Sequence, residues 1–216
     1  MEDILDEEEL DQPQTFTDQE IFTFIWTRPR SVFKFLNDYK YDKFLYPLMI
    51  LVGIVNAFER VSDKSIGDSF SLLYTFAICI IFGGLFGWVS YYFYAALMSW
   101  TGKALDGKAN TSSILRVLAY ASFPHILTLI LLILSIVVYG HNLLTIDGEL
   151  SGHGLISTIF ILVFLVIQLA LSLATVVLGV IGISEVQGFG IGKAILNFII
   201  PILLLMIPFL LIYVLS

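Results

Sequence analysis

Cysteine and charge are both scarce in this sequence. A single cysteine, Cys79, occurs among 216 residues, which excludes an intramolecular disulfide framework and any metal site built from several cysteines. Charged residues make up only 13% of the chain, against roughly a quarter in soluble domains. Hydrophobic residues make up 58%, and the mean hydropathy is +0.91. The composition therefore predicts an integral membrane protein. Because no cationic segment precedes the first apolar run, we expect no cleavable signal peptide.

The acidic residues are concentrated at the start of the chain. Nine of the eighteen acids lie in the first twenty residues, so the net charge of −7 describes the tail rather than the body. Residues 1–17 are predicted to be a disordered, cytoplasmic, acidic tail. Such a tail is suited to recruiting a basic protein partner, or it could fold back over Arg28, Arg30 and Lys34. Nucleic-acid binding is not expected, because the basic residues belong to the lipid interface.

Apolar runs predict how the chain crosses the bilayer. A span needs about 20 apolar residues, and five segments qualify if the first, of only fifteen residues, is helped by basic residues at its ends. The predicted spans are residues 44–58, 70–100, 117–139, 155–183 and 194–215. The second is longer than one membrane thickness, and Gly83, Gly84 and Gly87 within it predict close helix packing or a bend. The predicted fold is therefore an all-α polytopic membrane bundle of five transmembrane helices over residues 43–216.

The positions of lysine and arginine predict the orientation. With a cytoplasmic N-terminus and five spans, nine basic residues fall inside and only Arg60 and Lys64 fall outside. The nine are Arg28, Arg30, Lys34, Lys40, Lys43, Lys103, Lys108, Arg116 and Lys193. The C-terminus would then lie outside, and the expected location is a bacterial inner membrane.

The segment 18–42 is predicted to form amphipathic interfacial helices. Thr17 and Glu20 fit a capping box that starts one helix near Asp18. Pro29 can open a second helix that places Phe33 on an apolar face and its cations on the other. This pattern is typical of a helix that lies in the membrane interface. The predicted membrane-interface residues are Trp26, Arg28, Pro29, Arg30, Phe33 and Lys34.

Three polar side chains fall inside predicted spans: His125, Gln168 and Asn197. Polar groups at membrane depth are either functional or satisfy the bundle interior through interhelical hydrogen bonds. Glu59 falls at the end of its predicted span, so we expect no buried acid to pair with them. A small transporter or channel lined by the three groups is therefore the alternative interpretation, not the first.

The loop QGFGIGKA, residues 187–194, resembles a phosphate-binding loop only superficially. Gln187 stands where a P-loop needs its first glycine, and Ala194 stands where it needs serine or threonine. A tight cytoplasmic turn is the better interpretation, and with the loop 102–109 it offers a docking surface. The candidate residues are Lys103, Lys108, Glu185, Gly188, Gly190 and Lys193. The predicted outer loop 141–154 contains two histidines and two acids, but their spacing matches no metal or hydrolase motif.

Several local patterns together resemble the Yip (Ypt/Rab-interacting protein) domain family in its bacterial branch. They are the entry from Trp26 to Phe33, the run ILRVLAYASFP at residues 114–124, the loop SEVQGFGIGKA at residues 184–194 and the cluster of about five spans. The resemblance implies a polytopic helical protein with a cytosolic N-terminus, whose eukaryotic relatives act in vesicle trafficking and membrane organisation. The aspartate, leucine, tyrosine, glycine, proline motif of the eukaryotic branch is absent from this sequence.

Taken with this resemblance, the sequence predicts a membrane scaffold or adaptor. Its partners would be the lipid bilayer and a protein bound through the acidic tail and cytoplasmic loops. We expect no enzymatic activity, no catalytic residues, no cofactor and no metal, because no nucleophile with a base and an orienting partner is apparent. Neither the partner's identity nor the oligomeric state follows from these patterns.

Overall fold

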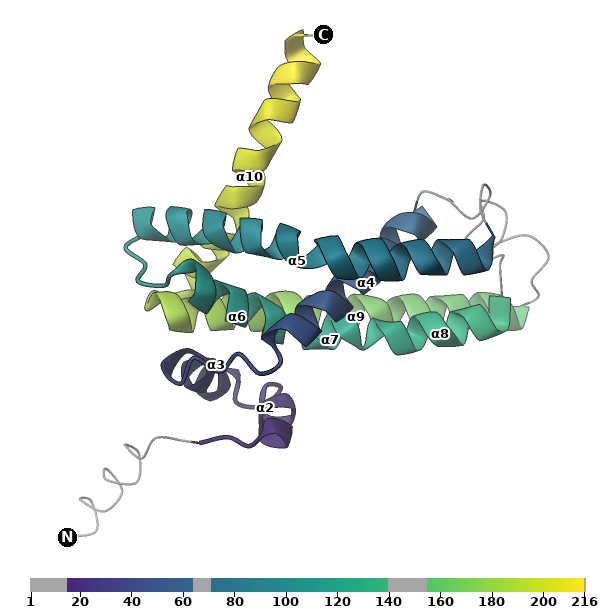
Figure 1. The fold of residues 1–216 in the computed structure, drawn as a ribbon, viewed down its shortest axis with the longest axis horizontal. Helices are drawn as coiled ribbons and strands as arrows, with labels where there is room; N and C mark the ends of the chain where they lie inside the picture. Colours follow the sequence, from purple (N-terminus) through teal and green to yellow (C-terminus); the bar gives the residue numbers. More distant parts are fainter. Residues whose placement is uncertain (1–14, 64–70, 140–154, 216) are drawn as a thin grey trace.

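The computed structural model describes residues 15–63, 71–139 and 155–215. All regular elements in these residues are helices, which confirms the predicted all-α class. In chain order they are α2 Asp18–Phe24, α3 Pro29–Asp38, α4 Leu45–Asp63, α5 Leu72–Ala104, α6 Thr111–Ala121, α7 Phe123–Ile126, α8 Thr128–Tyr139, α9 Leu155–Gln187 and α10 Ile191–Leu215. The long helices form a bundle, α2 and α3 lie beside one end of it, and α10 projects away (Figure 1). The acidic tail through residue 14 and the predicted outer loop 140–154 lie outside the described residues.

The helices α2 and α3, with the connector 39–44, form a cap on one end of the bundle. As predicted, α2 begins at Asp18, and the Glu20 carboxylate accepts a hydrogen bond of 2.8 Å from the Thr17 backbone N–H. Pro29 opens α3 because the first helical position needs no backbone donor. The apolar face of α3 packs against α6 and α9, where the Phe33 ring lies over Gly182. The cap is therefore held by ordinary hydrophobic burial.

Glycines bring α4 and α5 into backbone contact. A Cβ atom built on Gly53 would lie 2.3 Å from the carbonyl oxygen of Gly83 and 2.8 Å from the Cα atom of Gly87. The predicted close packing at Gly83 and Gly87 is thus confirmed, and Gly53 is its partner on α4. Small residues that let two backbones approach are a common basis of helix association in membranes.

The third predicted span is broken into α6, α7 and α8. Its two halves bend by 43° between Ala121 and Phe123, where the Ser122 hydroxyl donates to the Leu118 carbonyl at 2.7 Å. Pro124 follows at once and has no N–H to continue the helical hydrogen bonding. The proline in the predicted span therefore marks a real change of direction.

Among the described residues, two helices are long and apolar enough to cross a membrane, and the bent pair makes a third. The two are α5 and α9. The first predicted span corresponds to α4, which continues past residue 58 and includes Glu59 and Arg60. The fifth corresponds to α10, in which the stretch Ile191–Ile207 counts as a shorter apolar helix. The five-span topology therefore remains a prediction.

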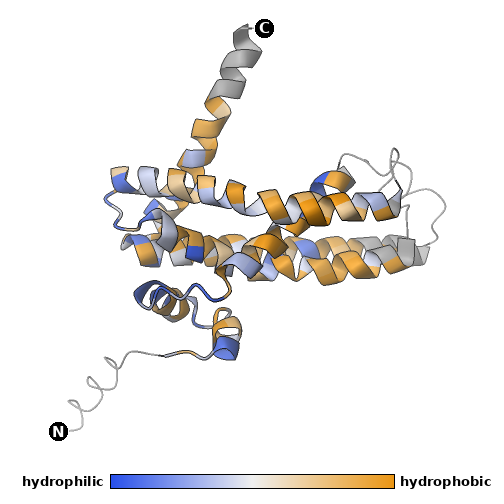
Figure 2. Cartoon of the chain, viewed as in Figure 1, coloured by the Kyte–Doolittle hydropathy of each residue, from blue (hydrophilic) through white to orange (hydrophobic). Residues whose placement is uncertain are grey.

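Exposed apolar side chains define where lipid covers the bundle. On α5 they fall within residues 73–93, apart from Trp100, and on α9 within residues 159–177. The α5 range is about 30 Å long at about 1.5 Å per residue, which matches the hydrocarbon thickness of a bilayer. We call these two ranges the apolar belt. Apolar residues dominate α5, α8, α9 and α10, whereas hydrophilic residues gather in the cap and the α5–α6 loop (Figure 2).

Candidate functional sites in the belt and beneath the cap

Glu59 and His125 are the centre of a polar cluster contributed by several helices. The Glu59 Oε2 atom lies 3.6 Å from His125 Nε2, and its Oε1 atom accepts a 3.3 Å hydrogen bond from the Gln168 amide. The Asn56 Oδ1 atom lies 3.3 Å from the same ring nitrogen, and the Thr175 hydroxyl accepts from the His125 backbone N–H at 3.1 Å. The His125 side chain is 13% exposed. An acid and a base thus meet between α4, α7 and α9.

The cluster lies within the apolar belt. Gln168 falls inside the α9 range, and Gly83, which contacts α4, falls inside the α5 range. Ionisable groups at this depth are costly unless they are paired or hydrated, and they commonly mark functional sites. The contact between Glu59 and His125 provides such a pairing.

Glu59 reaches the intramembrane polar groups, although its side chain is 35% exposed and it is therefore not a fully buried acid of the kind whose absence was expected. That expectation ended the first span at residue 58, but α4 continues to Asp63, so Glu59 belongs to the same helix face as Asn56. The spacing of three residues between them was the signal that sequence reasoning missed, because residues at i and i+3 are neighbours on a helix.

Asn197, the third predicted intramembrane group, has different partners. Its amide donates to the Met98 carbonyl at 2.9 Å and to the Thr101 hydroxyl at 2.8 Å, while its Oδ1 atom accepts from Gln187 at 3.1 Å. Asn197 is fully buried. Because it shares no hydrogen-bond partner with His125 or Gln168, the three predicted polar groups do not form one continuous contact network.

Gln187 is the centre of this second network, which we call the amide lock. Its Oε1 atom accepts from the Ala109 backbone N–H at 3.0 Å, and its backbone carbonyl accepts from the Lys108 backbone N–H at 3.1 Å. The side chain is fully buried, in a slot so narrow that Cβ atoms on Gly102 and Gly107 would lie 2.0 Å and 2.2 Å from it. The lock therefore joins the ends of α5, α9 and α10 beneath the cap.

The structure brings the two predicted docking loops together. Lys193 donates to the Leu105 carbonyl and to the Asp106 carboxylate, both at 3.0 Å. Gly188 adopts a φ of +71°, a conformation that side chains rarely accept, so the turn after α9 requires glycine there. Of the remaining candidate loop residues, Lys103, Lys108 and Gly190 are exposed and Glu185 is half-buried.

The predicted interface stretch divides between protein and surface. Phe33 is fully buried beneath the cap, so it contacts the chain's own helices rather than lipid. Trp26 is 43% exposed and lies against Phe123. The cations Arg28, Arg30 and Lys34 are exposed, and Pro29 is half-buried at the start of α3. Lipid contact by this stretch therefore stays a prediction that rests on Trp26 and the cations.

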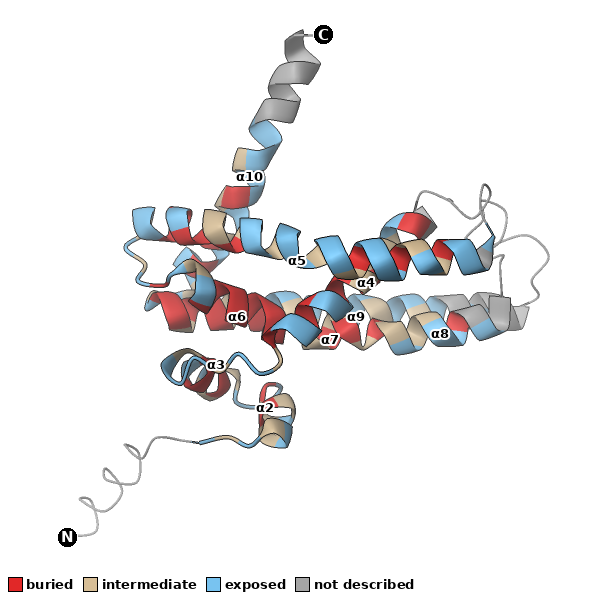
Figure 3. Ribbon diagram, viewed as in Figure 1, coloured by how far each residue is buried: buried red, intermediate tan, exposed pale blue. Residues whose placement is uncertain are grey.

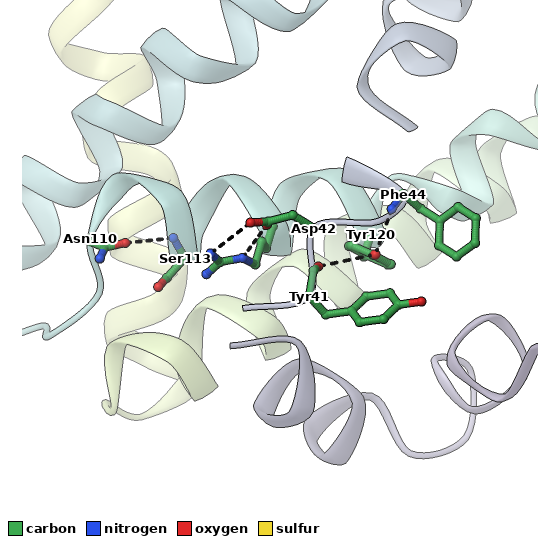
Figure 4. A network of polar contacts seen from close by, with 7 residues as sticks. Tyr41, Asp42, Phe44, Asn110, Ser113 and Tyr120 are labelled. Atoms are coloured by element: carbon green, nitrogen blue, oxygen red, sulfur yellow. Dashed lines mark hydrogen bonds and ion pairs between the residues drawn. The ribbon is translucent and has the colours of Figure 1, made fainter. Parts of the chain in front are cut away.

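Arg116 ties the cap connector to α6. The Arg116 side chain is 8% exposed, and its guanidinium binds both carboxylate oxygens of Asp42, at 2.6 Å and 3.4 Å. Beside it, the Tyr120 hydroxyl donates to the Tyr41 carbonyl and accepts from the Phe44 backbone N–H (Figure 4). Arg116, which was counted among the nine basic residues of the cytoplasmic side, is therefore buried and paired within the chain rather than exposed to headgroups.

Comparison with known protein families identifies this architecture. The Yip1 domain profile matches residues 24–212, which is most of the chain. The chain belongs to the Yip1 domain family. No curated protein and no solved structure matches it at a significant level. The match begins within α2 and ends within α10, so both polar networks lie inside the Yip1 domain.

Membership of the Yip1 family supports an integral membrane protein and a membrane-associated role, as predicted. The family is one of non-enzymatic membrane proteins. Within the described residues, no group of three or more histidine, cysteine, aspartate or glutamate side chains is arranged to hold a metal ion.

Proposed function

We propose that this Yip1-domain protein is an integral membrane scaffold that recruits protein partners through its cytoplasmic tail and loops. The observation that carries the proposal is the cap. Its helices and the loops after α5 and α9 gather at one end of the bundle, with Lys193 bonded to Asp106 and the amide lock beneath them. A surface whose supporting side chains are fixed by packing is better prepared for binding than a set of loose loops.

The proposed topology has five spans, a cytoplasmic N-terminus, an outer C-terminus and a bacterial plasma-membrane location. Its support is the positive-inside rule. The described basic residues, apart from Arg60, belong to the cap, the last turn of α5, the α5–α6 loop, α6 and the start of α10. Placing this end in the cytoplasm satisfies the rule for all of them.

Charge supports a docking role for this end of the molecule. Arg28, Arg30 and Lys34 are exposed on the cap. Lys103 is exposed in the last turn of α5, and Lys108 is exposed on the loop that follows. Their positive charge favours an acidic protein surface or anionic headgroups, whereas the acidic residues of the tail favour a basic partner. The proposed docking surface thus combines exposed basic residues with the acidic residues of the tail.

The test is crosslinking in native membranes followed by mass spectrometry. Three forms are compared: the whole chain, a chain lacking residues 1–12, and a full-length Lys103→Glu, Lys108→Glu variant that reverses exposed loop charge. We expect the same partner to crosslink to the whole chain and to be lost, at least tenfold, in one of the altered forms. Equal capture by all three forms, or capture of lipid and copies of the chain alone, would contradict the proposal.

A further inference from the structure

A cavity of about 330 Å³ lies beside the Glu59–His125 cluster, and neither polar network fills it. The cavity is lined by residues of α4, α5, α6, α9 and α10, together with Ser122. Its volume is within the range of small-molecule sites. The question is which ligand its lining and its opening would accept.

The cavity opens laterally toward lipid. Ser90 of α5 and Val176 of α9 line it and are both exposed, Val176 by 57%. These are the two helices that qualify as membrane spans. Ser90 and Val176 also lie in the parts of the two belt ranges nearest the cap. The opening between them therefore faces the bilayer beside the apolar belt.

The chemistry of the lining favours an anion. Among the described residues that line the cavity, Arg60 is the only charged one. Ser90 and Tyr91 add hydroxyl donors, and Asn56 directs its Oδ1 atom to His125, which leaves its amide N–H groups for another acceptor. The neighbouring Glu59 carboxylate is engaged by Gln168 and His125. A guanidinium with hydroxyl and amide donors matches phosphate, which accepts several hydrogen bonds.

The apolar part of the lining favours a ligand that also has a hydrocarbon portion. Leu118, Val176 and Phe198 form this part of the wall. The Tyr94 hydroxyl is already used, since it donates to the Phe198 carbonyl at 2.8 Å. We propose that this cavity binds an anionic phospholipid, with the phosphate at Arg60 and the acyl chains leaving between α5 and α9 past Val176.

The test uses the full-length protein in a neutral detergent, with phosphatidylglycerol as probe and phosphatidylcholine as the zwitterionic comparison. Bound lipid is counted by native mass spectrometry across a concentration series. We expect phosphatidylglycerol to bind at least tenfold more tightly than phosphatidylcholine. Arg60→Gln should lose at least tenfold in affinity for phosphatidylglycerol, whereas Arg60→Lys should keep part of it. Lys40→Gln, which removes an exposed cation of the connector 39–44 that neither lines the cavity nor belongs to the proposed docking cations, is the matched control and should bind as the unaltered chain does.

A second variant keeps the test independent of Arg60's effect on folding. Ser90→Phe places a large side chain at the exposed opening and should reduce lipid binding without removing any charge. Glycerol phosphate and inorganic phosphate separate the lipid from a soluble anion, and neither should displace phosphatidylglycerol at millimolar concentration. Displacement by either ion, equal binding of the two lipids, or unchanged binding in both Arg60→Gln and Ser90→Phe would overturn the proposal.

Discussion

The two halves of this Yip1 domain are stabilised in different ways. Beneath the cap, every residue of α6 from Ser113 to Ala121 is buried, and α3 adds a buried apolar face. In the belt half, α5, α8 and α9 expose large apolar side chains on most turns (Figure 3). A separate, smaller core of Phe58, Val61 and Cys79 is found there. Lipid is as apolar as leucine, so burying these side chains would bring the belt half little stability.

This difference explains where each half uses polar groups and glycine. The cap half gains from hydrophobic burial and adds an amide lock whose groups are fully buried. The belt half depends on the backbone contact of Gly53 with Gly83 and Gly87 and on the Glu59–His125 cluster. Helix contact in the belt half therefore uses glycines together with one polar cluster. In the cap half it uses buried side chains.

The largest expected effect comes from filling the glycine contact of the belt half. In Gly53→Leu, the new side chain would meet backbone atoms of α5, which cannot rotate away. We expect a loss of at least about 3 kcal/mol in the free energy of unfolding, since overpacking without room to relax is strongly destabilising. The measurement is unfolding of the purified protein by a denaturing detergent, followed by circular dichroism.

Gly192→Leu is the matched control for that variant. A Cβ atom on Gly192 meets nothing within 4 Å, and the residue lies in α10, so a leucine there should be neutral or slightly stabilising. If Gly53→Leu unfolds like this control, then the α4–α5 glycine contact does not hold the belt half together.

The amide lock should give the next largest effect, and it tests the cap half. Gln187→Ala leaves the Ala109 backbone N–H and the Asn197 side-chain Oδ1 atom buried without their partner. We expect a loss of about 2–3 kcal/mol in unfolding free energy. Gln168→Ala makes the equivalent change in the belt half and should cost only about 0.6 kcal/mol, the average for membrane hydrogen bonds. Equal losses in the two variants would remove the distinction between the halves.

A smaller effect is expected where the cap connector meets α6. Asp42→Ala removes the carboxylate that pairs with the buried Arg116, but Asp42 itself is 49% exposed, so water can partly replace it. We expect a loss of about 1–2 kcal/mol, below the value for a fully buried pair. The double variant Asp42→Ala, Arg116→Met should recover part of this loss, because it also removes the unpaired charge. Urea unfolding of the unaltered chain, Asp42→Ala and the double variant measures these changes in unfolding free energy. A double variant less stable than Asp42→Ala would contradict the expected recovery.

Local signals in the sequence predicted the helices well. Thr17, Glu20 and Pro29 determined where α2 and α3 begin, and long apolar runs located α5 and α9. These signals act between residues close in the chain, so they can be recognised without the fold. The close packing at Gly83 and Gly87 was also predictable, because small residues one turn apart on an apolar helix mainly allow another helix to approach closely.

The sites depended on contacts between residues far apart in the sequence. Gln187 was considered only as a missing glycine of a phosphate loop, yet it bonds to the backbone of Ala109, 78 positions away. Phe33 was expected to contact lipid, because an amphipathic pattern does not say whether lipid or protein covers the apolar face. Glu59 was missed because hydropathy alone ended its helix too early. Each of these errors concerns the partner of a side chain rather than its local conformation.

The smallest expected effect concerns the contact between α2 and the connector. Hydrogen bonds from Lys43 and then Tyr41 hold the pKa of Asp18 below its usual value of 3.8. A lowered folded-state pKa means that this contact stabilises the cap above about pH 4 and is lost as the pH falls through the folded-state value. Burial, with the Asp18 contact, raises the pKa of Tyr41 to about 12, so its contribution persists below pH 10 and is lost above it.

Trp26 can report this loss, because its ring packs against Phe123 at a centroid distance of 6.3 Å. In a Trp88→Phe, Trp100→Phe background, we expect Trp26 fluorescence to change between pH 4 and pH 2 as the cap loosens. Glu20 also has a lowered pKa, through its contacts with Thr17, so it adds to the acid transition. Asp18→Asn isolates the Asp18 part: this variant should already be slightly destabilised at pH 7 and show a weaker acid transition. An unchanged transition in Asp18→Asn would mean that the acid transition comes from Glu20 and that the Asp18 contact does not stabilise the cap.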